Sequence, residues 1–376
     1  MNEKAEILRK QRRERFEKTL NYEIPDKLPV FLMGHVAPAK YADPNIVVAD
    51  AIRKPEYFID KAYEGLEMLK DVDAVQGFLN PINRLLGLAW MSRTKLPGIE
   101  LEEDDMIQII EDGKMTYDDY DVILNKGWIY FQNKYMEDVM DIHLGDKSFQ
   151  FSDRFRAYST QKLDEYGYLN WDGGGCPLIF DWLTSMRGIA PFFRDMKKEP
   201  EKIKAVLDVM FEDTIEDFKK SCNKLSTRDF AVMVNPGVRG NCDFVARAVY
   251  EKFVWPYTIG YADAVIEADI PVFFHYDARW DSFLDFFTYF PKGKCIFDTD
   301  GMTDIYKVKE ILGGRMAITA NTPSALLTLG TPDEVYNYVK KQINEIGPNG
   351  FIVTSSCSTP SNAKPENLKA LVDACR

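Results

Sequence analysis

The stretch IPVFFHYDARWDSFLDFFTYFPKGKCIFDTDG, residues 270–301, decides the fold of this chain. It begins with a β-branched and aromatic run at 270–275 and ends with a second apolar run at 294–298. Such near-continuous apolar runs are typical of strands that are buried on both faces. The segment between them, 280–290, predicts a helix. The stretch therefore predicts one strand–helix–strand unit of a parallel sheet.

The same alternation continues in both directions along the chain. Strands are predicted at 29–35, 72–77, 169–173, 230–237, 270–275, 294–298, 315–321 and 351–356. Helices are predicted between most of them, including 55–70, 200–225, 248–268, 303–312, 331–347 and 364–376. Eight such units predict an α/β fold of the TIM (β/α)8 barrel type, with one domain over residues 1–376. A doubly wound open sheet is the alternative, but no GxGxxG motif follows the first strand.

The N-terminus, residues 1–28, is predicted to be a helical extension of the barrel. Its helix, at 3–20, has only Ile7, Phe16 and Leu20 as apolar contacts. We therefore expect the charge-rich face of this helix to be solvated.

The segment between the second and third predicted strands also departs from the alternation. Residues 105–131 contain alternating stretches around Asp112-Gly113, which predict an inserted β-hairpin. Residues 132–165 are aromatic and polar, and we expect them to form a lid or an excursion that faces the substrate.

Composition and charge exclude several classes of protein. A hydrophobic content of 45% over 376 residues excludes a disordered chain. A net charge of −12 argues against a nucleic-acid-binding protein, which needs a basic patch. The six cysteines are spread singly, no apolar run approaches the roughly 20 residues that span a bilayer, and the charged N-terminus is unlike a signal peptide. We expect a cytoplasmic protein with reduced thiols and no membrane contact.

Polar side chains follow every predicted strand. They are His35, Gln76, Asn80, Trp171, Asp172, Asn235, Arg239, His275, Asp277, Asp298, Asp300, Asn321 and Cys357. Residues at the carboxyl ends of barrel strands face the active site. The predicted substrate-binding residues are Asn235, Arg239, Tyr276, Asn321 and Trp171, and the predicted catalytic residues are Asp298 and His35.

His275, Asp277 and Cys357 are the predicted metal ligands. A neutral imidazole, a carboxylate and a thiolate form a competent ligand set for Zn²⁺. His275 and Asp277 are two residues apart, which places their side chains on the same side of an extended chain. Each has an alternative: a satisfied core histidine, a carboxylate that orients His275 or pairs with Arg279, and a buried or nucleophilic cysteine. Asp298 and Asp300, in turn, predict either acid–base carboxylates or helix caps.

With these residues in place, the chain resembles the uroporphyrinogen decarboxylase superfamily, in its branch of corrinoid-dependent methyltransferases from methanogens and acetogens. The resemblance lies in IPDKLPVFLMGH (24–35), in the middle stretch that begins CPLIFDWLTSMRG (176–188), and above all in the C-terminal third, including ITANTPSALLTLGTPDEV (318–335) and GFIVTSSCSTPSNAKPENLKAL (350–371). The family fold is a TIM barrel.

The resemblance also distinguishes between branches. Uroporphyrinogen decarboxylases have a sequence like R-Q-A-G-R after the first strand, with arginines that bind the carboxylates of the substrate. This chain has MGHVA at 33–37, so those arginines are missing. In the methyltransferase branch, which this chain resembles, zinc is carried by a His-x-Cys pair after the fifth strand and a Cys after the eighth. His275 and Cys357 match the outer positions, and Asp277 stands in place of the middle cysteine.

The resemblance implies a zinc-dependent methyltransferase. It implies transfer of a methyl group between a small methylated compound and the cobalt of a corrinoid carried by a separate protein. A methyl ether is the favoured donor, because 13% of the residues are aromatic. We also count a homodimer among the expected assemblies. The alternative enzyme is a metal-independent decarboxylase of a small acid other than uroporphyrinogen, and the non-enzymatic alternative is a binding protein.

Overall fold

A closed parallel barrel forms the centre of the protein in a computed structural model, which describes residues 3–143, 145–225 and 232–376. The barrel strands are β1 (Phe31–Met33), β2 (Ala74–Gln76), β5 (Leu169–Asn170), β6 (Asp172–Gly175), β7 (Val232–Gly237), β8 (Val272–Tyr276), β9 (Cys295–Asp298), β10 (Ala317–Thr322) and β11 (Phe351–Ser355). β5 and β6 continue one another across Trp171 and together form one barrel strand. The barrel therefore has eight strands, each at a predicted position. Residues 230 and 231 of the fourth predicted strand lie outside the described residues.

The barrel strands pair in parallel, in the order in which they occur along the chain. β1, β2 and β5 form one sheet, and β6 through β11 form the other. The bridge between Val30 and Val353 brings β11 beside β1, and the amide of Val353 donates to the carbonyl of Pro29 at 2.9 Å. The predicted TIM barrel is therefore confirmed, because the last strand lies beside the first and closes the barrel.

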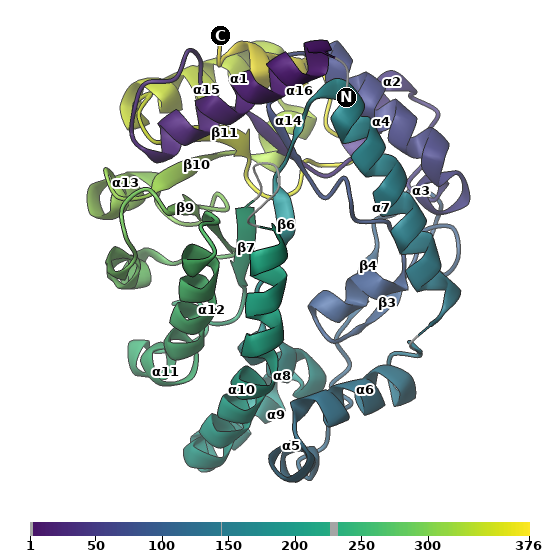
Figure 1. Ribbon diagram of the computed structural model, residues 1–376, viewed down its shortest axis with the longest axis vertical. Helices are drawn as coiled ribbons and strands as arrows, with labels where there is room; N and C mark the ends of the chain where they lie inside the picture. The colour runs from purple at the N-terminus through teal and green to yellow at the C-terminus, as the bar shows by residue number, and fades with distance from the viewer. Residues whose placement is uncertain (1–2, 144, 226–231) are drawn as a thin grey trace.

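Helices surround the barrel (Figure 1). They are α2 (Val36–Ala42), α3 (Asp50–Arg53), α4 (Pro55–Leu69), α7 (Lys147–Tyr166), α8 (Ile179–Arg187), α9 (Ile189–Lys198), α10 (Pro200–Leu225), α11 (Arg247–Phe253), α12 (Trp255–Glu267), the 3₁₀ helix η2 (Asp281–Tyr289), α13 (Ile305–Leu312), α14 (Ser324–Leu329), α15 (Pro332–Ile346) and α16 (Pro365–Asp373). The segment predicted as a helix at 280–290 takes the tighter 3₁₀ form. None of the described helices is long and apolar enough to cross a membrane.

The helix α1 (Glu3–Leu20) closes one end of the barrel. Phe16 and Leu20 enter the cluster of buried side chains that fills the barrel interior, together with Phe31, Met33, Ala74, Leu169, Trp171, Val232, Phe273, Ile296, Ala317 and Ile352. The ring of Phe16 lies 4.9 Å from that of Trp171, centroid to centroid. The N-terminal extension is thus part of the core.

The expectation of a solvated charged face on α1 is correct for Glu6, Lys10, Glu14 and Glu17, which are exposed, but wrong for three arginines. Arg9, Arg12 and Arg15 are all buried, whereas Ile7 is 53% exposed. Arg15 pairs with the buried carboxylate of Asp73 and with Asp26. The guanidinium of Arg12 lies 4.1 Å from the centre of the Tyr168 ring. The free-energy cost of burying these arginines is offset because each charge is paired with a carboxylate or stacked on a ring.

The insertion between β2 and α7 contains an antiparallel pair, but earlier in the chain than predicted. β3 (Arg93–Lys95) pairs with β4 (Gln108–Ile110), and the helices η1 (Arg84–Ala89), α5 (Asp119–Lys126) and α6 (Trp128–Asp138) complete the insertion. A hairpin around Asp112-Gly113 is therefore wrong. Tyr120 and Ile123, three residues apart, bury one face of α5, and this helical spacing prevails over the local alternation.

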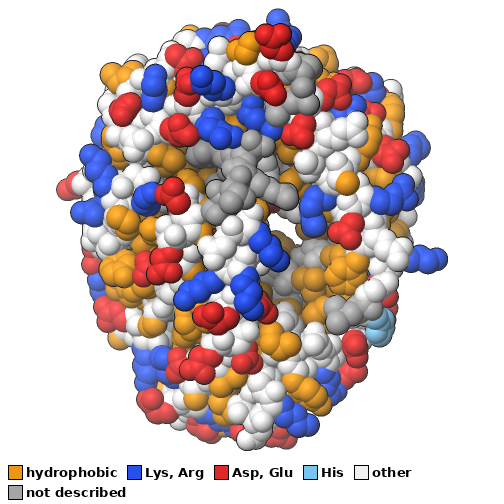
Figure 2. Space-filling model, in the orientation of Figure 1, with side chains coloured by type: hydrophobic (Ala, Val, Ile, Leu, Met, Phe, Trp, Pro, Cys, Tyr) orange, Lys and Arg blue, Asp and Glu red, His pale blue; other side chains and the backbone are white. Residues whose placement is uncertain are grey.

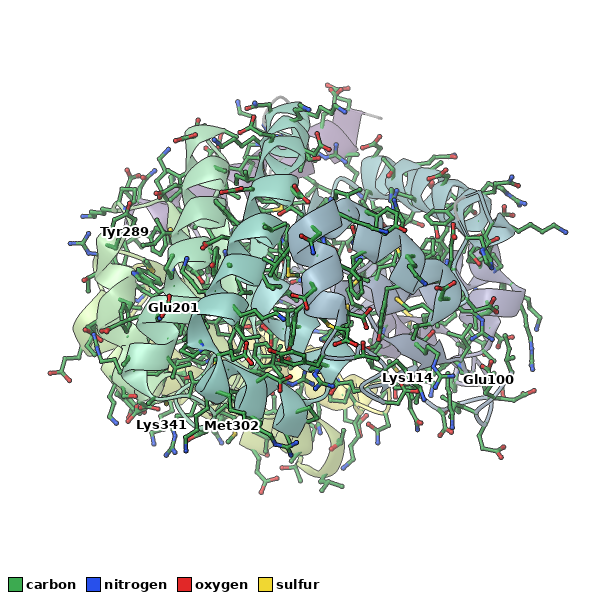
Figure 3. The ribbon with its side chains drawn as sticks, turned by 90° about the horizontal axis from the view of Figure 1, so that it is seen from below. Glu100, Lys114, Glu201, Tyr289, Met302 and Lys341 are labelled. Atoms are coloured by element: carbon green, nitrogen blue, oxygen red, sulfur yellow. The ribbon has the colours of Figure 1, made fainter. Side chains whose placement is uncertain are left out.

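The segment 132–165 is a helical layer. Its C-terminal part, α7, packs on α4, where the hydroxyl of Tyr63 donates to the carbonyl of Ser159 at 3.1 Å. Figure 2 shows the surface hollowed between the barrel side, at β6 and α10, and the insertion side. In Figure 3 Glu100 and Lys114 of the insertion lie to the right, whereas Met302, after β9, and Tyr289 lie to the left.

Candidate metal centre

The three predicted metal ligands converge at the carboxyl end of the barrel. His275 is the penultimate residue of β8, Asp277 directly follows that strand, and Cys357 lies in the loop after β11. Nε2 of His275 lies 3.9 Å from Sγ of Cys357 and 3.5 Å from Oδ1 of Asp277. The donor atoms of all three lie within 4.8 Å of one another. One ion can therefore contact a nitrogen, an oxygen and a sulfur at the same time.

Strand alternation explains how His275 reaches this place. Side chains of a strand point alternately to its two faces. Phe273 belongs to the interior cluster and Phe274 to the layer beneath the helices. His275 shares the face of Phe273, so it points into the barrel, whereas Tyr276 points outward.

Asp298 holds the histidine ring in one orientation. Its Oδ2 lies 2.5 Å from Nδ1 of His275, and its Oδ1 accepts from the hydroxyl of Thr319 at 2.8 Å. Asp298 is only 1% exposed. Burial lowers the pKa of His275, but the bonds to Asp298 and Cys357 outweigh it and leave the pKa raised well above its usual value. With Nδ1 facing Asp298, Nε2 is the atom that can bind a metal ion.

Negative charge accumulates around the three ligands. Burial raises the pKa of Asp277, and burial together with the charge of Asp277 raises the pKa of Asp300 to about 7. In the described part of the chain no lysine or arginine forms an ion pair with Asp277, Asp298 or Asp300. Asp298 is buried, and Asp277 and Asp300 are partly buried. Negative charge without a cation is costly in such surroundings, so a cation bound among the three would stabilise the cluster. A mixed N, O, S set suits Zn²⁺, and three protein ligands leave a position for a substrate.

The opposite half of the barrel mouth presents backbone. Gly34, Gly77 and Gly174 follow β1 and β2 and lie on β6, with φ of +94°, +80° and +119°. A Cβ atom on any of them would meet no other atom closer than 3.7 Å. Packing does not demand glycine at these positions. Gly174 faces Met233 in the layer outside the barrel, so only Gly34 and Gly77 leave open space after β1 and β2.

Two predicted substrate-binding residues lie behind the barrel wall. The hydroxyl of Tyr276 donates to Oδ1 of Asn235 at 3.0 Å, and both side chains are buried. They line a cavity of about 40 Å³ beneath α8 and α12. Side chains at neighbouring positions of a strand point to opposite faces. Asn235 and Tyr276 point outward from the barrel, which conflicts with the prediction that they bind substrate at its mouth.

Two further predicted substrate-binding residues, Trp171 and Asn321, make structural contacts. Trp171 is fully buried and its ring stacks on Phe31 at 4.4 Å within the interior cluster. Oδ1 of Asn321 accepts from Gln342 of α15 at 2.7 Å. Both positions follow strands, but their side chains are committed to packing and to a helix.

Arg239 connects the insertion to the barrel. Its guanidinium pairs with Glu111, just after β4, and donates to the hydroxyls of Thr184 and Ser185 on α8 at 3.0 and 2.8 Å. Its backbone amide donates to Asp181 at 2.8 Å. These partners occupy the side chain that was predicted to bind substrate.

His35, predicted to be catalytic, lies in an aromatic cluster. Its ring is 5.1 Å from Phe58, 5.9 Å from Phe78 and 6.1 Å from Phe155, centroid to centroid. Only 7% of the residue is exposed, and Nε2 has no hydrogen-bond partner. Burial lowers the pKa of His35 to about 4, so the ring is neutral at physiological pH.

This burial predicts a pH-dependent stability. As pH falls below the unfolded-state pKa of about 6.5, the unfolded chain binds a proton that folded His35 refuses, and stability is lost until pH 4. We expect His35 to cost about 2 kcal/mol between pH 7 and pH 5. Urea unfolding at several pH values should show that His35→Phe removes this part of the pH dependence. The matched change His143→Gln, at a side chain 57% exposed, should leave it; equal slopes for wild type and His35→Phe would contradict the prediction.

Sequence reasoning missed Thr319 and Thr303. Thr319 faces Asp298 from β10, and Thr303 bonds to the backbone of Ala278 and Trp280. Thr319 carried a usable signal, since it is a polar residue two positions from Ala317, a member of the interior cluster. Thr303 carried none, because its partners lie more than 20 residues away.

Comparison with known proteins agrees with the barrel. The profile of the uroporphyrinogen decarboxylase (URO-D) family matches residues 174–376, which is more than half of the chain. The chain belongs to the URO-D family. A solved structure of a methyltransferase from Methanosarcina mazei is similar over 96% of this chain and 97% of its own, with a TM-score of 0.59 and 15% identity. That likeness shows the fold. No match was found among curated protein sequences.

The region that matches the URO-D family includes the ligand cluster. The matched region contains His275, Asp277, Asp298 and Cys357. The sequence resemblance to the family is thus confirmed by an independent comparison, and the ligand cluster lies in its most specific third.

Proposed function

We propose that this URO-D family protein is a zinc-dependent methyltransferase that works with a corrinoid on a separate protein. The observation that carries the proposal is the cluster of His275, Asp277 and Cys357, with Asp298 holding the imidazole. The methyltransferase from Methanosarcina mazei, similar over nearly the whole chain, supports the same reaction class.

The residues present would hold Zn²⁺ through Nε2 of His275, a carboxylate oxygen of Asp277 and Sγ of Cys357. Zinc bound there would act as a Lewis acid that stabilises negative charge on an oxygen or sulfur of the substrate. Asp298 and Thr319 keep His275 in the ligating orientation. With one carboxylate replacing a thiolate, the ligand set donates less electron density, which strengthens this Lewis acidity.

We propose a methyl ether as the donor: the bond between the methyl carbon and the ether oxygen would break, the methyl group would pass to the cobalt of the corrinoid, and the oxygen would leave as an alkoxide or phenolate. That leaving group is poor without stabilisation of its charge, which is the need that the cluster would meet. The open backbone at Gly34 and Gly77, after β1 and β2, leaves room for a bulky reactant at the barrel mouth. We propose that a corrinoid-carrying partner supplies that reactant, and a homodimer remains a prediction.

Zinc content together with a transfer assay tests the proposal. Protein purified without chelator should contain about one equivalent of zinc by elemental analysis. With reduced corrinoid it should demethylate at least one of a panel containing methoxylated aromatics, methanol, methylamines and methylthiols, followed by the corrinoid absorption spectrum. Less than about a tenth of an equivalent of zinc would sink the mechanism. Carbon dioxide release from a small acid by metal-free protein would favour a decarboxylase.

A further inference from the structure

The short turn that carries Asp277 is held tightly by its surroundings. The amide of Asp277 donates to the carbonyl of Gly237 at 2.9 Å, and Nε1 of Trp280 donates to the carbonyl of Asp277 at 2.8 Å. Trp280 is 1% exposed. The backbone on both sides of the Asp277 side chain is therefore attached to buried structure.

The loop after β9 grips the next residue at both of its polar backbone groups. The amide of Ala278 donates to Oδ2 of Asp300 at 3.3 Å, and the carbonyl of Ala278 accepts from the hydroxyl of Thr303 at 3.2 Å. The same hydroxyl accepts from the amide of Trp280 at 3.1 Å. Thr303 is 2% exposed, so water does not compete for these bonds.

The two loops meet through residues in a conformation that L side chains rarely adopt. Ala278 has φ of +69° and Asp300 has φ of +48°. Neither is glycine, so each conformation persists only because its surroundings determine it. The contacts between Ala278, Asp300 and Thr303 are those surroundings. Removal of one contact should let the turn relax and move Asp277 away from His275.

We propose that Asp300 and Thr303 are positioning residues that place Asp277 as the oxygen ligand of the cluster. This inference rests on the proposed function, because it assumes that the cluster holds zinc. Asp277 stands where the resemblance to corrinoid-dependent methyltransferases implies a cysteine. A Zn–O bond, at about 2.0–2.2 Å, is shorter than a Zn–S bond, at about 2.3 Å, so the backbone must place the carboxylate of Asp277 accurately. Outer partners of this kind typically raise metal affinity 10- to 100-fold.

Thr303 offers a matched pair of variants. T303V keeps the shape of the side chain and removes the hydroxyl, whereas T303S keeps the hydroxyl. We expect T303V to bind zinc at least tenfold more weakly than T303S, measured by competition with a chromophoric chelator at pH 7. The same pair in a D277A background should bind zinc with equal affinity, since the bonds act through Asp277.

Asp300 offers a second pair that does not depend on a fully buried site. Its residue is part-exposed, so D300A and D300N should both fold, as urea unfolding of the metal-free proteins would check. D300N keeps an oxygen for the amide of Ala278 and D300A does not, while both lose the charge. We expect D300A to bind zinc several-fold more weakly than D300N; this pair decides the matter if T303V does not fold.

The outcomes separate the two proposals. Wild type that holds zinc, with equal affinities within both pairs, would overturn the positioning role and leave the proposed function standing. A difference between T303V and T303S that persists in the D277A background would show that Thr303 acts otherwise than through Asp277. Wild type without zinc would refute the proposed function itself.

Discussion

Replacing Cys357 by alanine is expected to remove both the zinc and the activity of the protein. Cys357 supplies the one sulfur of a three-ligand set, and the remaining pair, His275 and Asp277, cannot hold zinc firmly by itself. Loss of an outer partner already costs 10- to 100-fold in affinity, so loss of a direct ligand should cost more than about 100-fold. Elemental analysis and the transfer assay on the same preparation would measure both effects.

Cys242 supplies the matched control. It is also a half-exposed, free cysteine near the carboxyl end of the barrel, but its Sγ bonds to the carbonyl of Arg279 and it is outside the ligand cluster. Cys242→Ala should keep zinc and activity. Zinc retained in Cys357→Ala would move the metal site elsewhere, and loss of zinc in both variants would point to general damage.

Replacing Phe16 by alanine is expected to be the most destabilising single change in the N-terminal helix. The side chain is fully buried in the barrel interior, in the same cluster as Trp171 and Phe31. Truncation of a buried phenylalanine removes its burial energy and leaves a cavity, at a cost of about 3–5 kcal/mol. The free energy of unfolding from urea denaturation would measure this loss.

Ile7 is the control on the same helix. It is 53% exposed, so Ile7→Ala should change the free energy of unfolding by less than about 0.5 kcal/mol. A loss of under 1 kcal/mol for Phe16→Ala would show that α1 does not close the barrel in solution. Zinc content of the folded Phe16→Ala protein should be unchanged, because α1 lies at the end of the barrel away from the cluster.

Much of the fold is written locally in the chain. Most barrel strands are buried on both faces, so their composition alone, as in VFFHY at 272–276, marks them as strands. The insertion was misjudged because β3 and β4 pair across twelve intervening residues, and a pairing of that kind leaves no mark on either strand. The arginines of α1 were misjudged because their partners, such as Asp73, lie far along the chain.

The candidate site divides in the same way. His275, Asp277 and Cys357 were predicted from their types and places at strand ends, and the structure brings them together. Asn235 and Tyr276 were predicted by the same rule and lie behind the wall. Place along a strand says that a residue is near the mouth, but its parity decides which face it occupies.

By itself, the sequence determined the repeating β/α units, the barrel they imply and the reactive residues at the strand ends, because these depend on burial and spacing within one unit. The tertiary structure alone decided that Phe16 fills the barrel, that Arg239 connects the insertion to the barrel, and that Asp298, Asp300 and Thr303 surround the ligand cluster. These contacts join strands and loops distant in the chain, and their energies depend on geometry that only the closed barrel creates.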